Sequence, residues 1–198
     1  SPGHTFVKLM VKQKPELVNF RAPKPIDPIR EKGRYVQPDE MEKVLADSPE
    51  DTIILDARSR YEYEVGRFKG ALIFDIENFR ELPEQLEQLK QHADKRIITY
   101  CTGGIKCEKL TAYLLEEGFK HVEQLHGGIL GYAEETGGKD FEGQCYVFDD
   151  RVTVPVNDVN PSVIGSCHHC GTPTERAVNC ANAKCHKRTL LCDTCAEE

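Results

Sequence analysis

The 198-residue chain contains no run of about 18 or more apolar residues, which excludes a transmembrane helix within it. Its opening residues, Ser1-Pro2-Gly3-His4, lack the apolar h-region of a secretory signal peptide, so we do not expect such a signal. The chain also lacks the Gly-x-Gly-x-x-Gly fingerprint of flavin and nicotinamide sites, and it has no internal repeat. What is left is a chain with room for one core of good size and a small appendage.

Acidic residues outnumber basic ones, 33 to 26, and the charge is unevenly distributed. The net charge is −7, composed of +5 over residues 1–34, −12 over 35–165 and none over 166–198. Contacts to phosphate need clustered basic groups, so an acidic body of this kind argues mildly against binding to nucleic acid. A local basic face within that body is still compatible with the composition.

Cysteine is abundant, and six of the nine cysteines lie between positions 167 and 195. In the absence of an export signal, we expect reduced thiols and a cytoplasmic location rather than disulfides. Two Cys-x-x-Cys knuckles, close to zinc-ribbon spacing, are formed by Cys167, Cys170, Cys192 and Cys195. Four thiolates suit a closed tetrahedral zinc site, and a tail of about 30 residues needs a metal to fold. Reduced cysteines without metal are the alternative, and Cys180 and Cys185 are left as candidates for a second site or for replacing a knuckle.

Strand and helix patterns alternate through the middle of the chain. We expect strands over 52–56, 71–74, 96–100 and 122–125, and helices over 38–45, 82–91 and 107–117, with Gly118 capping the last. One more strand is expected around 145–148, in an otherwise irregular stretch. This alternation predicts an α/β fold with a parallel sheet and helices on both faces. In such sheets, functional residues lie at the carboxyl ends of the strands.

Cys101 occupies such a strand end. It follows the expected strand 96–100 and precedes a Thr102-Gly103-Gly104 loop that leads into a helix. The free N–H groups and dipole of a helix N-terminus favour an anion, and Lys106 adds a positive charge nearby. These groups should lower the pKa of the thiol and make Cys101 a nucleophile near neutral pH. A buried structural cysteine is the alternative.

Four other side chains near this loop each have two interpretations. Arg58 and Arg60 follow the expected strand 52–56, and either could bind a phosphate or stabilise the thiolate. An ion pair with Glu62 or Asp56 is the alternative for them. Lys106 is expected to face substrate or solvent. Cys107 could form a disulfide with Cys101 or serve only as a helix residue.

The N-terminal region has its own pattern. Residues 5–12 alternate as a strand does, and four prolines then predict a linker or surface arm over 13–34. A single strand cannot form a sheet by itself, so we expect it to be a remnant of a domain further upstream.

Three motifs resemble those of a known family. Asp56-Ala57-Arg58-Ser59-Arg60-Tyr61-Glu62-Tyr63, with Gly66 to Ala71, resembles the first signature of rhodanese domains. The Cys101 loop resembles their active-site loop, and Leu125-His126-Gly127-Gly128-Ile129 resembles the glycine turn that follows it. The longer match of Tyr100 to Lys109, and of Gly143-Gln144-Cys145-Tyr146-Val147-Phe148-Asp149-Asp150-Arg151, is similar to the rhodanese-domain tRNA uridine(34) hydroxylase family.

That resemblance implies a domain plan. It implies a rhodanese-like catalytic domain over 35–140, a connector over 141–165 and a cysteine-rich zinc module over 166–198. It also implies that residues 1–34 belong partly to a missing ferredoxin-like domain.

The resemblance also implies an activity. The expected reaction is oxygen-dependent hydroxylation of the wobble uridine of tRNA to 5-hydroxyuridine, with Cys101 as the essential thiolate. A sulfurtransferase carrying a persulfide on Cys101 is the alternative, and a non-catalytic binding module is another. His92-Ala93-Asp94 is the local half of an iron site, but it precedes strand 96–100 at the end opposite Cys101, so we assign no iron.

Overall fold

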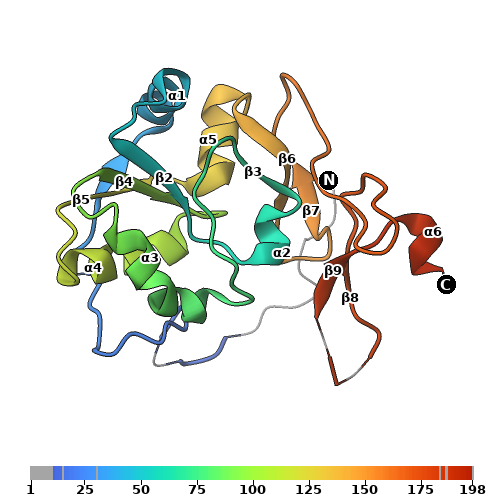
Figure 1. Ribbon diagram of the computed structural model, residues 1–198, viewed down its shortest axis with the longest axis horizontal. Helices are drawn as coiled ribbons and strands as arrows, with labels where there is room; N and C mark the ends of the chain where they lie inside the picture. The colour runs from blue at the N-terminus through green and yellow to red at the C-terminus, as the bar shows by residue number, and fades with distance from the viewer. Residues whose placement is uncertain (1–10, 15, 30, 183, 186, 198) are drawn as a thin grey trace.

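The computed structural model describes residues 11–14, 16–29, 31–182, 184–185 and 187–197 (Figure 1). The strand expected over 5–12 therefore lies almost entirely outside the described residues. The arm from 16 to 29 contains no helix or strand, as its prolines predict. Among the described residues, no helix is long and apolar enough to cross a membrane.

The central sheet is fully parallel. Its strands β1 (Arg34–Val36), β2 (Thr52–Asp56), β4 (Arg96–Tyr100) and β5 (His121–Leu125) lie in the order β1-β5-β4-β2. Successive residues of β4 point to opposite faces, so that Ile97 and Ile98 are both fully buried in two different cores. A sheet covered on both faces requires apolar side chains in both directions, as the sequence predicts.

Helices cover each face of this sheet (Figure 1). On one face, α1 (Pro38–Asp47) and α5 (Gly128–Thr136) contribute Met41, Val44 and Ile129 to the core. On the other face lie the 3-10 helix η1 (Phe79–Gln85), α3 (Leu86–Lys90) and α4 (Ile105–Glu116). The predicted α/β fold is therefore confirmed.

A second, antiparallel sheet brings residues 66–68 together with segments between 141 and 155. It consists of β3 (Gly66–Phe68), β6 (Phe141–Tyr146) and β7 (Thr153–Pro155), and the one-turn helix α2 (Arg60–Tyr63) precedes it. Phe68 and Phe141 pack edge to face with ring centroids 5.3 Å apart. The sequence predicts one strand in the connector, around 145–148. The connector contains two strands instead, β6 over 141–146 and β7 over 153–155, and β6 pairs with β3.

The C-terminal region is a hairpin of β8 (Ala177–Asn179) and β9 (Arg188–Leu190), followed by α6 (Asp193–Ala196). It lies at one side of the molecule, next to α2 (Figure 1). Leu190 is only 1% exposed and packs with Val65 and Tyr146, so the hairpin shares a small core with the larger domain.

Two expected elements differ from those observed. Residues 71–74 form a single bridge, Leu55 to Leu72, because the N–H groups of Ala71 and Ile76 bond to Phe68 and Phe74 in turns. The helix expected over 82–91 is split into η1 and α3. Pro83 lies inside η1, and because proline has no N–H it interrupts regular helical bonding there.

Candidate active site

Cys101 lies directly after β4, and α4 begins four residues later at Ile105. The intervening turn needs a left-handed residue, and Gly104 supplies it with φ of +87°. Cys101 is only 2% exposed, so its sulfur lies at the base of the loop rather than at the surface.

Backbone hydrogen bonds fix the orientation of this loop. The N–H groups of Ile129 and Leu130, in α5, donate to the carbonyls of Cys101 and Thr102 at 3.0 and 3.1 Å. With those carbonyls held away from the sulfur, the Gly104 N–H donates to the Cys101 Sγ at 3.2 Å.

Gly128 makes this arrangement possible. Its φ is +62°, and a Cβ at this position would lie 2.4 Å from the Cys101 carbonyl oxygen. Only glycine allows both the left-handed conformation and the close approach. The glycine turn after β5 is therefore a packing requirement of the cysteine loop.

The surroundings of Cys101 favour its thiolate. A hydrogen bond from the Cys107 thiol, the charge of Lys106 and the N–H groups of Lys106 and Cys107 together outweigh burial and lower the pKa of Cys101 to about 7. Burial, and then the neighbouring Cys101 thiolate, raise the pKa of Cys107 well above its usual value. Cys107 thus remains protonated and acts as a hydrogen-bond donor when Cys101 is ionised.

Lys106 is anchored by an acidic partner. Its Nζ lies 3.0 and 2.7 Å from the two carboxylate oxygens of Glu62, which is fully buried. The same ammonium lies 5.2 Å from the ring centroid of Phe148. Glu62 also accepts the N–H of Ser59 at 3.0 Å, in a capping box at the start of α2. This places a fixed positive charge beside the cysteine loop.

The sequence alone indicates Glu62 as an ion-pair partner of Arg58 or Arg60 and not of Lys106. The Ser-x-x-Glu pattern of the capping box was the available signal for its position in α2. The contact between Glu62 and Lys106 spans 44 residues, and no local pattern indicates it.

Arg58 and Arg60 have acidic partners. The buried Arg58 guanidinium bonds to both oxygens of Asp56 at 2.9 and 2.7 Å, and it also donates to the carbonyls of Glu62 and Gly66. Arg60 lies 3.2 Å from Asp75 and also contacts Glu77. Both arginines are therefore in ion pairs. Arg58 pairs with Asp56, one of the two expected partners, whereas Arg60 pairs with Asp75 and Glu77 and with neither expected partner.

Thr102 and Gly103 make different contributions to the loop. Thr102 Oγ1 donates to the Tyr146 carbonyl at 3.3 Å, which ties the loop to β6. A Cβ on Gly103 would meet no atom within 4 Å, so the loop is open to solvent at this point.

Two hollows adjoin the loop on different sides. A groove of about 850 Å³ is lined by Gly103, Gly104, Ile105 and His126, together with apolar residues of the arm. A smaller pocket of about 230 Å³ touches the loop only through Lys106.

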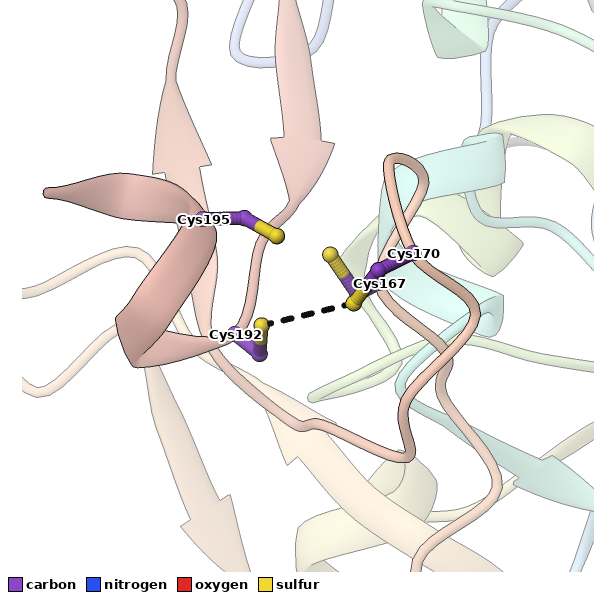
Figure 2. A group of neighbouring side chains, drawn as sticks. All are labelled: Cys167, Cys170, Cys192 and Cys195. Carbon is purple, nitrogen blue, oxygen red and sulfur yellow. Dashed lines mark hydrogen bonds between the residues drawn. The ribbon is translucent and has the colours of Figure 1, made fainter. Parts of the chain in front are cut away.

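The four knuckle cysteines meet in space (Figure 2). The Sγ atoms of Cys167, Cys170, Cys192 and Cys195 all lie within 4.8 Å of one another. Cys170 and Cys192 are 3.6 Å apart, close to the roughly 3.8 Å edge of a tetrahedron with Zn–S bonds of about 2.3 Å. This donor set fits a zinc ion.

The other candidate ligands lie elsewhere. Cys180 and Cys185 are in the turn that joins β8 to β9 and are not members of the four-cysteine group. His92 and Asp94 precede β4, at the opposite end of the strand from Cys101, and Asp94 pairs with Lys120 at 3.3 Å.

The chain matches two family models. Residues 37–135 match the rhodanese-like domain model, which covers half of the chain, and residues 142–198 match a model described as rhodanase C-terminal. A solution NMR structure of the rhodanese-like domain from the Anabaena sp. Alr3790 protein is 24% identical. It covers 64% of this chain and 89% of that chain, with a TM-score of 0.46.

Curated relatives are much more similar. The tRNA uridine(34) hydroxylase of Cytophaga hutchinsonii is 50% identical over 99% of this chain and 62% of its own length. The protein of the same name from Listeria welshimeri is 48% identical over 95% of this chain and 59% of its own length. The chain thus spans about 60% of the length of these relatives. From the matched domain, and from the cysteine loop described above, the chain belongs to the rhodanese-like domain family.

Proposed function

We propose that the chain is the catalytic part of an oxygen-dependent tRNA uridine hydroxylase that converts the wobble uridine, position 34, to 5-hydroxyuridine. The observation that carries this proposal is the Cys101 thiol, which accepts the Gly104 N–H and has its pKa lowered to about 7, in a chain that is 50% identical to a relative of that name. A thiolate that forms near neutral pH is what a covalent route through a pyrimidine requires.

In the proposed mechanism, Cys101 Sγ adds to C6 of the uracil. The C5–C6 π electrons move toward C5 and the C4 carbonyl, so C5 becomes a carbon nucleophile. C5 then forms a bond to one atom of molecular oxygen, and the O–O bond breaks as an external reductant supplies two electrons. Loss of the C5 proton and departure of the Cys101 thiolate from C6 restore the double bond. The N–H groups around Cys101 Sγ assist both its addition to C6 and its departure from C6, because they stabilise the sulfur as a thiolate.

The overall reaction needs more than the uridine. One atom of molecular oxygen becomes the new hydroxyl, and the other leaves as water with two protons and two electrons from an external reductant. The described residues supply the thiolate and the positive charge of Lys106, which favours negative charge on the substrate near the loop. Arg58 and Arg60 would act by holding α2 and the loop in place.

A structural zinc ion held by Cys167, Cys170, Cys192 and Cys195 completes the proposal. Zinc would stabilise the region 166–198, which has little core of its own, as a module next to the domain over 35–140. Residues 141–165 would connect the two. Because tRNA is the proposed partner, we place the protein in the cytoplasm.

The test is mass spectrometry of nucleosides from tRNA incubated with the protein, with and without oxygen. Wild type should add one oxygen atom to the wobble uridine, and Cys101→Ser or removal of oxygen should abolish the product. Cys145→Ala, which removes another buried thiol, is the matched control and should retain activity. Unmodified tRNA together with sulfur transfer from thiosulfate to cyanide would instead establish the sulfurtransferase alternative.

A further inference from the structure

Phe148 is an exposed aromatic residue beside the cysteine loop. It follows β6, and 53% of its surface is accessible, which is unusual for phenylalanine. One side of its ring is occupied by Lys106 Nζ, 5.2 Å from the centroid, and Tyr146 packs against it edge to face at 5.3 Å. The ring is thus held in place by its neighbours but is not covered by them.

Phe148 is the end of a continuous row of aromatic and basic side chains. Tyr146 packs against Tyr61 with ring centroids 5.1 Å apart. The guanidinium of Arg188 lies 4.7 Å from the centroid of Tyr61 and 5.0 Å from that of Tyr146. The row therefore extends from Lys106, in the first turn of α4, to β9 in the cysteine-rich tail. Tyr146 is buried, so the row supports Phe148 and leaves that ring exposed. An exposed aromatic ring beside basic groups is the usual surface for stacking of single-stranded nucleic acid.

A small pocket opens beside this row. Its volume is about 230 Å³, and its lining includes Tyr61, Asn78, Phe79, Arg80, Lys106 and Phe148. The volume is below the roughly 300–1,000 Å³ of sites for drug-sized ligands, so it suits one planar ring. Residues 101–104 are not part of the lining. A base in this pocket would consequently be a neighbour of the reacting uracil and not the uracil itself.

Arg80 provides a free donor at this pocket. Its Nε is buried and has no hydrogen-bond partner among the residues that the structure describes. An unsatisfied buried donor is destabilising, and a shift of the Arg80 side chain toward the pocket would let a carbonyl oxygen or ring nitrogen of a base satisfy it. The nearby carboxylates are already engaged, since Glu62 holds Lys106 and Glu77 contacts Arg60 and Lys187.

We propose that the pocket between Phe148 and Arg80 is a stacking subsite for one nucleobase of single-stranded RNA adjacent to the target uridine. The base stacks on Phe148 and accepts a hydrogen bond from Arg80. Stacking on an aromatic ring is tolerant of base identity, so the subsite positions the RNA rather than reads its sequence. This inference rests on the proposed function, because the RNA is the substrate of the reaction at Cys101.

The test is fluorescence anisotropy with an anticodon stem-loop RNA that has uridine at position 34, in which each neighbouring base is replaced in turn by an abasic ribose. Phe148→Ala should weaken binding of the intact RNA by about 5- to 150-fold, the usual range for one stacked base. Phe148→Trp should retain binding. Val159→Ala, at a residue that is 63% exposed and outside the pocket, is the control and should change nothing.

A double-mutant cycle makes the assignment specific. At one abasic position, the affinity of the wild type should fall by the same factor that Phe148→Ala causes with the intact RNA. Phe148→Ala should bind that abasic RNA as well as it binds the intact RNA. Unchanged affinity of Phe148→Ala, or equal additional losses at every abasic position, would overturn the subsite. If the wild type hydroxylates the RNA while Phe148→Ala binds normally, only the subsite fails. If the wild type neither binds nor modifies the RNA, the proposed function fails with it.

Discussion

Replacing Cys107 by alanine tests the electrostatics of the cysteine loop most directly. The Cys107 thiol is the largest contribution that lowers the pKa of Cys101 to about 7. Without this donor, we expect the pKa of Cys101 to rise toward the ordinary value of about 8.5. Cys107→Ser keeps an O–H donor in nearly the same place and should leave the midpoint close to that of the wild type.

The magnitude follows from the thiolate fraction and its reactivity. At pH 7 that fraction would decrease from about one half to about 3%, or roughly 16-fold. A thiolate of higher pKa is intrinsically more nucleophilic, by about 5-fold over 1.5 units at a Brønsted slope of 0.4–0.5. The variant should therefore be alkylated about 3-fold more slowly at pH 7 and about 5-fold faster above pH 9.

The assay is the pH dependence of iodoacetamide alkylation, followed by mass spectrometry of the Cys101 peptide because the chain has nine cysteines. The two rate profiles should cross between pH 7 and 9. Cys145→Ala removes a thiol whose pKa is raised to about 11 by burial, and it should leave the profile of Cys101 unchanged. A midpoint near pH 7 in Cys107→Ala would refute the assigned hydrogen bond.

Three further predictions concern stability. Gly128→Ala combines a left-handed backbone with a Cβ 2.4 Å from a carbonyl oxygen, so the free energy of unfolding measured in urea should fall by more than about 2 kcal/mol. Gly70→Ala, at φ of +73° with no atom within 4 Å of the new Cβ, is the control and should lower it by only about 1 kcal/mol. Lys106→Met leaves the buried Glu62 without its cation and should lower the free energy of unfolding by about 3–5 kcal/mol. Adding Glu62→Gln should restore most of this loss, and additive effects of the two substitutions would contradict the pairing. A strong chelator should make the region 166–198 sensitive to protease while the region 35–140 stays resistant, and unchanged resistance of the tail would exclude a structural metal.

The local sequence was sufficient where a pattern alone determines the element. Strands 52–56 and 96–100 have the expected bounds, because each centres on adjacent isoleucines, a β-branched apolar pair that favours a buried strand. The glycine loop after β4 was also predictable from local sequence, because a strand, two glycines and a helical run follow one another directly. The three-residue β1 and the one-turn α2 were missed, since such short segments show no periodicity.

The contacts that tune the site were not predictable from local pattern. The choice of Asp56 over Glu62 as the partner of Arg58 depends on Glu62 being taken by Lys106, 44 residues along the chain. The place of Phe148 beside Lys106 likewise depends on the pairing of β6 with β3, which the irregular composition of 139–165 conceals. Long-range pairing decides these contacts, and the sequence carries only weak signals for it.

The one-turn helix α2 occupies a shared position between two parts of the chain. Glu62 turns inward to the cysteine loop, whereas its neighbour Tyr61 lies under Arg188 of the C-terminal hairpin. Because α2 is a single turn, a shift of Tyr61 would also move Glu62. Deleting the tail to obtain a minimal catalytic domain would uncover Tyr61, Val65 and Tyr146 and loosen the support of Lys106. The hairpin thus supports the Cys101 loop through α2, and the boundary near residue 166 is a poor place to cut.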